Sequence, residues 1–374
     1  MDPNLVNRVL DMAIAIQQIP APTFAESKRA AFVCECFNEA GLADVSIDAT
    51  GNVYGRLPGR GTAQPVVVSA HTDTVFPAKT NLTVHREADK IHGPGIGDNS
   101  LGVAGLFGLV WALATKRPSR PEVKSELPGD LWLVANVCEE GLGDLRGMRV
   151  VVDRFEDSPR AYIILEGMAL GQIYHRGLGV QRYRITIRTS GGHSWVDYGR
   201  PSAIHELGGL VTRLTALPLP TRPRTSLNVG IIQGGTSINT IAAEASLELD
   251  LRSEGGRALG DLTGWVESLV RATSRSNIAA SCEVIGRRPA GKISTRHPLV
   301  QLAWDCLEAQ DIRPNLGVGS TDANIPLSRG LPAVCVGLTH GSGAHTVQEF
   351  IHTEPVSKGL AQVFELVTKA FAMP

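Results

Sequence analysis

His71-Thr72-Asp73 follows a short, largely apolar run at residues 66–70, where a buried strand is expected to end. Side chains two residues apart on an extended chain lie on the same side, so the imidazole of His71 and the carboxylate of Asp73 face one direction. A metal-bound imidazole needs an acceptor on its second ring nitrogen, because that contact fixes the tautomer and the ring angle. Taken alone, the tripeptide is typical of an ordinary loop as well as of a metal ligand with its orienting partner.

Further acidic and imidazole side chains follow apolar runs or stand in glycine-rich turns, namely Asp98, Glu139, Glu140, Glu166 and His345. In open α/β sheets, ligands bind outside the carboxyl ends of the strands, and these residues occupy such ends or the loops beyond them. Several carboxylates at one edge repel each other unless a multivalent cation lies among them. The pattern therefore predicts a metal site.

The adjacent pair Glu139-Glu140 favours hydrolytic chemistry at that site. Hydrolysis of an amide at neutral pH needs an activated water, and metal coordination lowers the pKa of water from ~15.7 to about 7. Consecutive residues at a strand end point in different directions, so one glutamate can bind metal while the other moves a proton. An isolated Glu-Glu is usually a solvated surface pair, but this one follows the mainly apolar residues 131–138.

The composition limits the classes of protein to which the chain can belong. With 374 residues and 43% hydrophobic content, it is long enough for two domains with cores of their own. A net charge of −1 provides no basic surface for nucleic acid or an anionic membrane. We find no positively charged leader before an apolar stretch, and no run that approaches a membrane span. We expect a cytoplasmic protein with neither a nucleic-acid partner nor a membrane partner.

The hydrophobic pattern changes twice along the chain. Residues 1–176 alternate helical stretches with short apolar strands, which is typical of an α/β sheet with helices on its faces. From 177 to 289 the strands alternate apolar and charged residues, which predicts an antiparallel sheet covered on one side by helices. The α/β pattern returns over 290–374. The fold class is therefore α/β, with a catalytic domain formed by 1–176 and 290–374 and an inserted α+β domain at 177–289.

The individual elements follow from the same patterns. The expected helices are 5–18, 26–40, 101–115, 202–216, 259–273, 297–309 and 355–371. The expected strands are 65–70, 131–138, 162–165, 182–188, 244–251 and 332–337. Residues 118–128 are predicted to form a charged surface loop.

Five short motifs occur in a characteristic order: His71-x-Asp73, Gly-Pro-Gly-Ile-Gly-Asp98-Asn-Ser, Cys-Glu139-Glu140-Gly, Leu-Glu166-Gly and Gly-Ala-His345-Thr. This order resembles the dinuclear zinc hydrolases that include carboxypeptidase G, peptidase T, succinyl-diaminopimelate desuccinylase and aminoacylase. The resemblance covers nearly the whole chain and implies a zinc-exopeptidase-type α/β/α catalytic domain. It also implies that the inserted domain is a lid through which two chains form a homodimer.

The resemblance implies that five residues bind two divalent metal ions: His71, Asp98, Glu140, Glu166 and His345. The aspartate that matches Asp98 bridges the two metals. His71 and Glu166 would complete one site, and Glu140 and His345 the other. Zinc is the expected metal, with cobalt or manganese as substitutes, because mixed nitrogen and oxygen ligation suits these ions.

The resemblance also implies catalytic roles for three further residues. Asp73 would support His71, and Glu139 would be the general base that acts on the water. His193, in Gly191-Gly192-His193-Ser194, matches a lid histidine that reaches the active site of the partner subunit in family dimers. There it stabilises the oxyanion that develops on the substrate.

Two residues of the inserted domain are expected to bind substrate. Asn239 matches the family's lid asparagine, and Arg288 resembles an arginine of carboxypeptidase G-like proteins, whose guanidinium suits a carboxylate. Arg287 and Arg288 are equally typical of a surface pair at a strand end. Trp195 departs from the small residue common at this place in the family. These residues do not distinguish a small peptide from an N-acyl amino acid, so either class of substrate is expected.

Two alternatives belong to other functional classes. One is a catalytically inactive homologue kept for metal binding or assembly, which would be expected to lack the base or a metal ligand. In this chain, every position that matches the base or a ligand has a residue able to fill that role. A nucleotide-binding α/β protein would use the glycine-rich residues 141–147 after the strand-like run. Glu139 and Glu140 would then face the phosphates, and two additional anions oppose phosphate binding.

Overall fold

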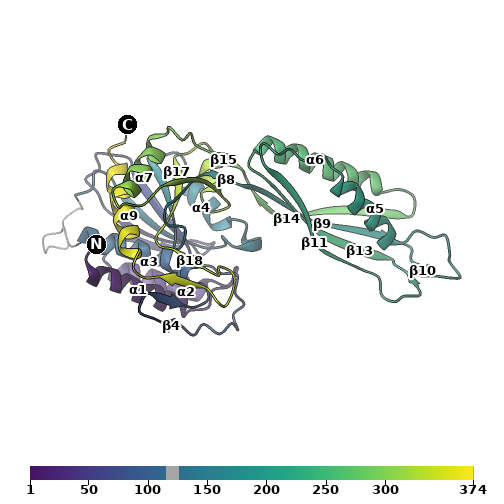
Figure 1. Ribbon diagram of the computed structural model, residues 1–374, viewed down its shortest axis with the longest axis horizontal. Helices are drawn as coiled ribbons and strands as arrows, with labels where there is room; N and C mark the ends of the chain where they lie inside the picture. Colours follow the sequence, from purple (N-terminus) through teal and green to yellow (C-terminus); the bar gives the residue numbers. More distant parts are fainter. Residues whose placement is uncertain (115–125, 374) are drawn as a thin grey trace. The chain divides into compact units, whose positions relative to one another are not determined.

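The computed structural model describes residues 1–114 and 126–373. The predicted loop at 118–128 lies for its larger part outside the described residues. The chain divides into two compact units (Figure 1). The main unit consists of Met1–Gly177 and Lys292–Pro374, and the inserted unit is Leu178–Gly291.

The large sheet of the main unit contains nine strands among the described residues. In chain order they are β1 (Ala43–Ile47), β2 (Val53–Leu57), β3 (Val66–His71), β6 (Leu131–Asn136), β7 (Ala161–Glu166), β8 (Gln172–Gly177), β15 (Gly291–Lys292), β16 (Asn315–Gly319) and β17 (Ala333–Gly337). Their spatial order is β1-β2-β6-β3-β7-β17-β8-β15, with β16 paired to β8. Because β6, β3, β7 and β17 are mutually parallel, their carboxyl ends meet at one edge.

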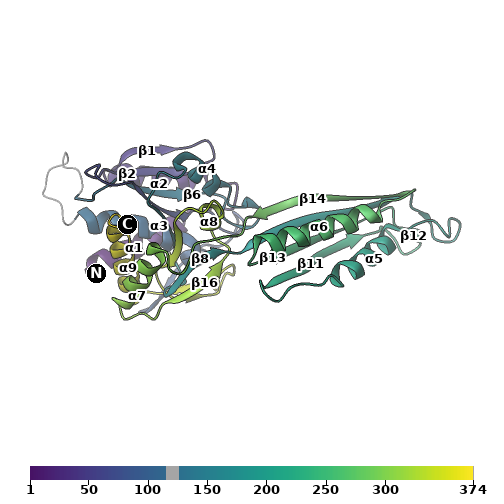
Figure 2. The ribbon, with the colours of Figure 1, turned by 90° about the horizontal axis from the view of Figure 1, so that it is seen from above.

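Helices cover both faces of this sheet (Figure 2). They are α1 (Pro3–Gln17), α2 (Ser27–Glu39), α3 (Leu101–Ala114), α4 (Arg146–Phe155), α7 (Pro298–Glu308), α8 (Asn324–Ser328) and α9 (Val356–Ala370). The chain passes from β3 through α3 to β6, and then back across β3 through α4 to β7. Right-handed crossovers in opposite directions place their helices on opposite faces, so α3 and α4 lie on different sides.

The apolar helix α3 corrects one expectation from the sequence. The window Ile96–Leu113 is long and apolar enough to cross a membrane by length and composition, so the expectation that no run approaches a membrane span was wrong. Within the protein, 89% of that window is buried. It is buried because α3 packs against β3, α1 and α9. A helix surrounded on all sides needs apolar residues on all sides, which gives it the composition of a membrane span.

A second, small sheet belongs to the main unit and was not predicted from the sequence. Its strands are β4 (His85–Arg86), β5 (Lys90–His92), β18 (Gly341–Ser342) and β19 (Phe350–His352), in the order β18-β19-β5-β4. Ile91 and Ile351 pair across β5 and β19, and both side chains are buried in the core. The segment after β5 leads to Asp98, and the loop between β18 and β19 contains His345. The small sheet therefore presents two of the predicted metal ligands.

The inserted unit contains a four-stranded antiparallel sheet with two helices on one face, as the alternating strands predicted (Figure 1). Its elements are β9 (Gly179–Thr189), β10 (Gly192–His193), α5 (Ala203–Thr215), β11 (Thr225–Gly234), β12 (Thr240–Ile241), β13 (Glu244–Ser253), α6 (Gly256–Thr273) and β14 (Ile278–Arg288). The sheet order is β11-β13-β9-β14. Apolar side chains such as Ile185 face the helices, and ion pairs such as Arg184 with Glu248 lie on the other face.

Candidate metal centre

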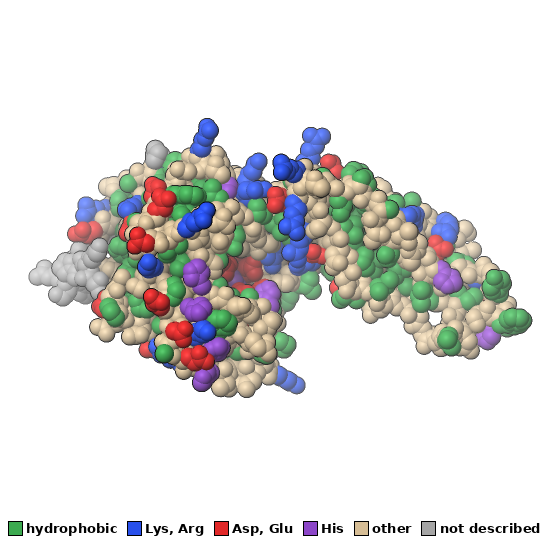
Figure 3. Space-filling model, viewed as in Figure 1, with side chains coloured by type: hydrophobic (Ala, Val, Ile, Leu, Met, Phe, Trp, Pro, Cys, Tyr) green, Lys and Arg blue, Asp and Glu red, His purple; other side chains and the backbone are tan. Residues whose placement is uncertain are grey.

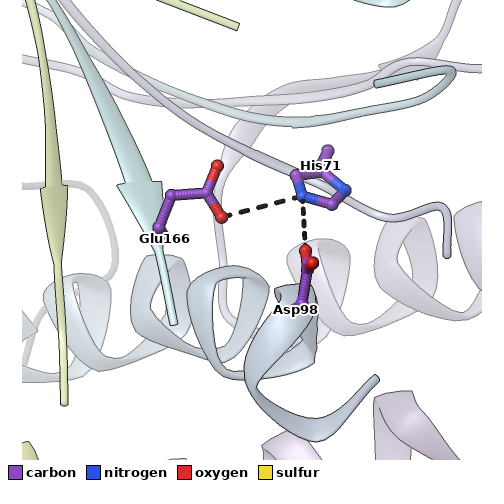
Figure 4. A group of neighbouring side chains, drawn as sticks. All are labelled: His71, Asp98 and Glu166. Atoms are coloured by element: carbon purple, nitrogen blue, oxygen red, sulfur yellow. Dashed lines mark ion pairs between the residues drawn. The ribbon is translucent and has the colours of Figure 1, made fainter. Parts of the chain in front are cut away.

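His71 ends β3 at the carboxyl edge of the large sheet, and its side chain is only 1% exposed. Its Nε2 atom lies 3.2 Å from Oδ1 of Asp98 and 3.7 Å from Oε2 of Glu166 (Figure 4). Glu166 ends β7, the strand next to β3, so parallel pairing brings the two residues to the same edge. Asp98 approaches from the glycine-rich segment before α3. Three chain segments thus converge on one imidazole nitrogen.

The carboxylate of Asp98 lies between two imidazoles. Its Oδ1 atom faces His71, and its Oδ2 atom lies 3.1 Å from Nε2 of His345. The same His345 nitrogen is 3.3 Å from Oε1 of Glu140. Each oxygen of Asp98 therefore faces a different histidine, with Glu166 beside His71 and Glu140 beside His345. A carboxylate in this position can bridge two metal ions.

Three groups of side chains among the described residues have ligand atoms close enough to share a cation, all within 4.8 Å of one another. They are His71 with Asp98 and Glu166, Asp98 with Glu140 and His345, and His71 with Glu139 and Glu140. The first two groups share Asp98. The third brings Glu139 to the same place, although its predicted role is that of a base. All five predicted ligands and the predicted base thus lie together.

Asp73 makes more contacts than the sequence indicated. The Nδ1 atom of His71 lies 3.1 Å from the main-chain oxygen of Asp73 and 3.5 Å from its carboxylate, so the main chain is the nearer acceptor. An acceptor there requires the proton on Nδ1, which leaves the lone pair of Nε2 for a metal. The carboxylate of Asp73 accepts hydrogen bonds of 2.9 Å from the backbone N–H groups of Glu139 and Glu140. Asp73 therefore orients His71 and also holds the turn that carries both glutamates.

The pKa shifts of the histidines and of Asp98 show that this cluster of carboxylates favours positive charge beside it. Burial lowers the pKa of His71, but contacts with Asp73, Asp98 and Glu166 raise it well above its usual value. Contacts with Asp98 and Glu140 raise the pKa of His345 to about 10. Burial raises the pKa of Asp98, yet the two histidines hold it below its usual range. The carboxylates thus favour the protonated, positively charged form of both imidazoles. Two divalent metal ions would replace the positive charge of these protons. The donor set of imidazole nitrogens and carboxylate oxygens fits such ions.

Glu349 anchors the segment that carries Asp98, and no motif in the sequence indicates this role. The side chain is fully buried and accepts backbone hydrogen bonds from Gly95, Gly97 and Asp98 at 2.8, 2.7 and 2.8 Å. A Cβ atom on Gly97 would lie 2.8 Å from side-chain atoms of Ile351, so glycine is needed for this close approach. Glu349 and Asp98 are far apart in sequence, and only the small sheet brings them together.

Asp322 and Asn136 form a second buried contact that the sequence did not reveal. Oδ2 of Asp322 accepts a hydrogen bond of 2.6 Å from Nδ2 of Asn136, and both residues are fully buried. Asn136 ends β6 beside His71, and its main-chain oxygen accepts from Thr72. The remaining side-chain oxygens of Asn136 and Asp322 have no hydrogen-bond partner among the described residues. Burial raises the pKa of Asp322 to about 7.

This burial predicts a pH-dependent effect of Asp322→Asn. The folded-state pKa of about 7 lies above the ~3.9 of an unfolded aspartate, so the stabilising contribution of Asp322 is present below pH ~3.9 and lost as the pH rises through 7. Asparagine has the same shape and no charge. We therefore expect the free energy of unfolding of the variant to increase relative to wild type between pH 4 and 7, by at most about 4 kcal/mol.

Urea unfolding of both metal-free proteins at several pH values measures this difference. Asp261→Asn is a suitable control, because Asp261 is an exposed residue of α6. The control should show no such pH dependence. A constant difference between Asp322→Asn and wild type across this range would contradict the prediction.

The other predicted site residues belong to the inserted unit. His193 is exposed, and its Nδ1 atom accepts hydrogen bonds from the backbone of Trp195 and Val196 at 3.2 and 3.3 Å. A neutral His193 therefore carries its proton on Nε2 and presents a donor there. The pairing of β10 with β12 places Asn239 beside this segment, and its main-chain oxygen accepts from Ser194. Arg288 is the last residue of β14, away from that loop pair.

Comparisons with known proteins find a family whose pattern matches most of the chain. The sequence pattern of peptidase family M20/M25/M40 matches residues 67–369. A succinyl-diaminopimelate desuccinylase of Corynebacterium glutamicum is 25% identical over 348 residues, which is 91% of this chain and 90% of the relative. An acetylornithine deacetylase of Klebsiella pneumoniae is 26% identical over 80% of this chain and 79% of its own length.

Solved structures share the fold over almost the entire chain. A tripeptidase of Staphylococcus aureus superposes with a TM-score of 0.84 at 20% identity, covering 98% of this chain and 99% of its own. The YXEP protein of Bacillus subtilis, described as a dinuclear metal binding peptidase from family M20, has a TM-score of 0.71 at 15% identity and covers 100% of both chains. At these identities the likeness concerns the fold, and the predicted fold class is confirmed.

Proposed function

The chain belongs to peptidase family M20/M25/M40 and is a metallohydrolase, and from this premise we propose that it hydrolyses an amide bond in a small peptide or an N-acyl amino acid. The observation that carries the proposal is the position of Asp98, whose two carboxylate oxygens lie 3.2 and 3.1 Å from His71 and His345. A bridging carboxylate with a histidine and a glutamate on each side is a site for two metals at short separation.

The same residues would hold two divalent metal ions. His71, Glu166 and Asp98 would bind one ion. Glu140, His345 and Asp98 would bind the other. Zinc suits such mixed nitrogen and oxygen ligation, and cobalt or manganese can take its place. When bound, the ions lower the pKa of a water and polarise the carbonyl of the amide.

Glu139 is the proposed general base. Its backbone N–H is held by the carboxylate of Asp73, and its own carboxylate lies within ligand distance of His71 and Glu140. It is only 6% exposed, so bulk water does not compete strongly for its oxygens. In the proposed reaction Glu139 takes a proton from the attacking water and passes it to the leaving nitrogen. Glu140, its neighbour, remains a ligand throughout.

The inserted unit is the proposed lid and dimerisation domain. Its edge strand β11 exposes Ile231 and Ile232, and pairing with a second chain is one way to cover such an edge. In the proposed homodimer, His193 acts in the site of the partner subunit, where its Nε2–H group stabilises the oxyanion that develops on the amide carbonyl. Asn239 and Arg288 bind the substrate, with the guanidinium of Arg288 suited to a carboxylate.

We expect the purified protein to contain close to two divalent metal ions per chain. Chelation should abolish hydrolysis, and adding zinc, cobalt or manganese should restore it. Because His71 and His345 must lose protons to bind metal, metal uptake should also release protons at neutral pH. Elemental analysis, a pH-stat titration and an assay on a panel of N-acyl amino acids, dipeptides and tripeptides provide the three measurements. Absence of stoichiometric metal, with no gain in activity on adding these ions, would refute the proposal.

A further inference from the structure

The outer face of the small sheet carries two histidines and a glutamate that lie close to one another. His85 in β4 and His92 in β5 are direct partners in the antiparallel pairing, so their side chains lie on the same face. Glu87 follows β4 in the turn between the two strands, where its N–H donates to the main-chain oxygen of Lys90. Its Oε1 atom lies 3.8 Å from Nε2 of His85 and 3.3 Å from Nε2 of His92.

The Nε2 atom of His92 lacks a hydrogen bond. It is buried, and it has no hydrogen-bond partner among the described residues even though the Glu87 oxygen is 3.3 Å away. An ordinary ion pair between His92 and Glu87 would direct the ring N–H at the carboxylate, and this geometry does not. A buried polar atom without a partner is unfavourable, so its presence calls for an explanation. A cation between the two groups would occupy the nitrogen lone pair and the carboxylate together.

The surroundings favour a defined site over a loose surface cluster. The ring of His92 packs on Phe350 of β19 with 5.3 Å between ring centroids, which limits its rotation. The ring of His85 is 6.1 Å from that of His92, and its side chain is 75% exposed, so it can turn toward a bound ion. Figure 3 shows histidine and acidic side chains gathered over the region where Figure 1 labels β4 and β18.

We propose that His85, Glu87 and His92 form a metal site separate from the hydrolytic centre and bind one first-row transition-metal ion, with water in the remaining positions. Two imidazoles and one carboxylate on a short hairpin favour zinc, nickel or copper(II) over calcium and magnesium, which prefer all-oxygen ligation. None of the three residues belongs to the groups that surround Asp98, and their ligand atoms do not all lie within 4.8 Å of one another, so the exposed ring of His85 turns toward the ion to complete the site. The site therefore binds its ion whether or not the protein hydrolyses amides.

Equilibrium dialysis against zinc chloride tests this site on the intact protein. The His85→Gln/His92→Gln double variant should bind one fewer zinc ion per chain than wild type, whatever number the hydrolytic centre holds. His205→Gln is the matched control, because His205 is an exposed histidine that belongs to α5 of the inserted unit. The control should bind as much zinc as wild type. Glu87→Gln should weaken the binding of the same ion without removing a histidine.

Thermal unfolding of the metal-free variants verifies that each one folds as wild type does. A second readout is the absorption spectrum of the protein with copper(II), in which the double variant should lose one nitrogen-ligated copper component. Equal zinc stoichiometry and affinity in wild type and the double variant would overturn the proposal. An equal loss in His205→Gln would overturn it as well, because the zinc would then be bound by surface histidines in general.

Discussion

Glu139→Gln should retain the metal content of wild type while its turnover falls on the order of 10²-fold or more, the usual scale for the loss of a general base. The amide has nearly the same shape as the carboxylate, and the backbone of residue 139 stays bonded to Asp73 through its N–H. The variant therefore preserves the turn and removes only the ability to accept a proton. Elemental analysis and initial rates under saturating substrate measure the two effects separately.

Glu140→Gln is the matched comparison, because the two residues are adjacent and both N–H groups are bonded to the same carboxylate. Its side chain lies 3.3 Å from His345, so we expect this variant to lose metal at one site. The division of roles is wrong if Glu139→Gln loses metal and Glu140→Gln keeps it. It is also wrong if both variants keep their metal and full activity.

His193→Ala should reduce kcat about 10²–10³-fold, the range observed when one donor to an oxyanion is removed. The Nδ1 atom of His193 is engaged by the backbone of Trp195 and Val196, so the neutral ring has its Nε2–H available for a substrate. Metal content should not change, because His193 is not one of the five proposed ligands of the hydrolytic centre. His205→Ala, an exposed histidine in the same unit, is the control and should leave kcat unaltered.

Subunit exchange tests whether His193 acts across a dimer. A heterodimer of His193→Ala and Glu139→Gln chains contains one site in which both residues are intact if His193 serves the partner subunit. Mixing the two inactive variants should then restore activity to a level that follows the fraction of heterodimer. If verified heterodimers stay inactive, each chain uses its own histidine or none.

Much of the main unit could be predicted because a buried parallel strand appears in the sequence as a run of mainly apolar residues. All six residues of β3 are buried, and the run before His71 is apolar apart from Ser69. The run of β7 before Glu166 is likewise buried and apolar. A run of this kind locates the end of a strand, and the end of a parallel strand locates a binding edge. The family resemblance is likewise confirmed, since the pattern of peptidase family M20/M25/M40 covers residues 67–369.

The contacts that support the ligands could not be predicted from the sequence. Glu349 binds the backbone of Gly95 over a separation of 254 residues, and Asp322 binds Asn136 over 186. Neither acidic residue belongs to a periodic pattern or a short motif that would indicate its partner. The small sheet was missed for a related reason, since its strands contain only two or three residues each and show no alternation. The roles of the individual site residues stay predictions until the variants are measured.

The division of the ligands between two sheets gives the metals a mechanical role. His71 and Glu166 belong to strands of the large sheet, whereas Asp98 and His345 are presented by the small one. Ions held by both sets would act as cross-links between two layers that are otherwise joined by packing and by the hydrogen bonds of the Asn99 side chain with Leu165 and Gly167. Without the ions, we expect the segments that carry Asp98 and His345 to open more readily than the large sheet unfolds. The apoprotein would then lose its catalytic geometry by local unfolding of one layer, and each metal bound would restore cooperativity between the layers.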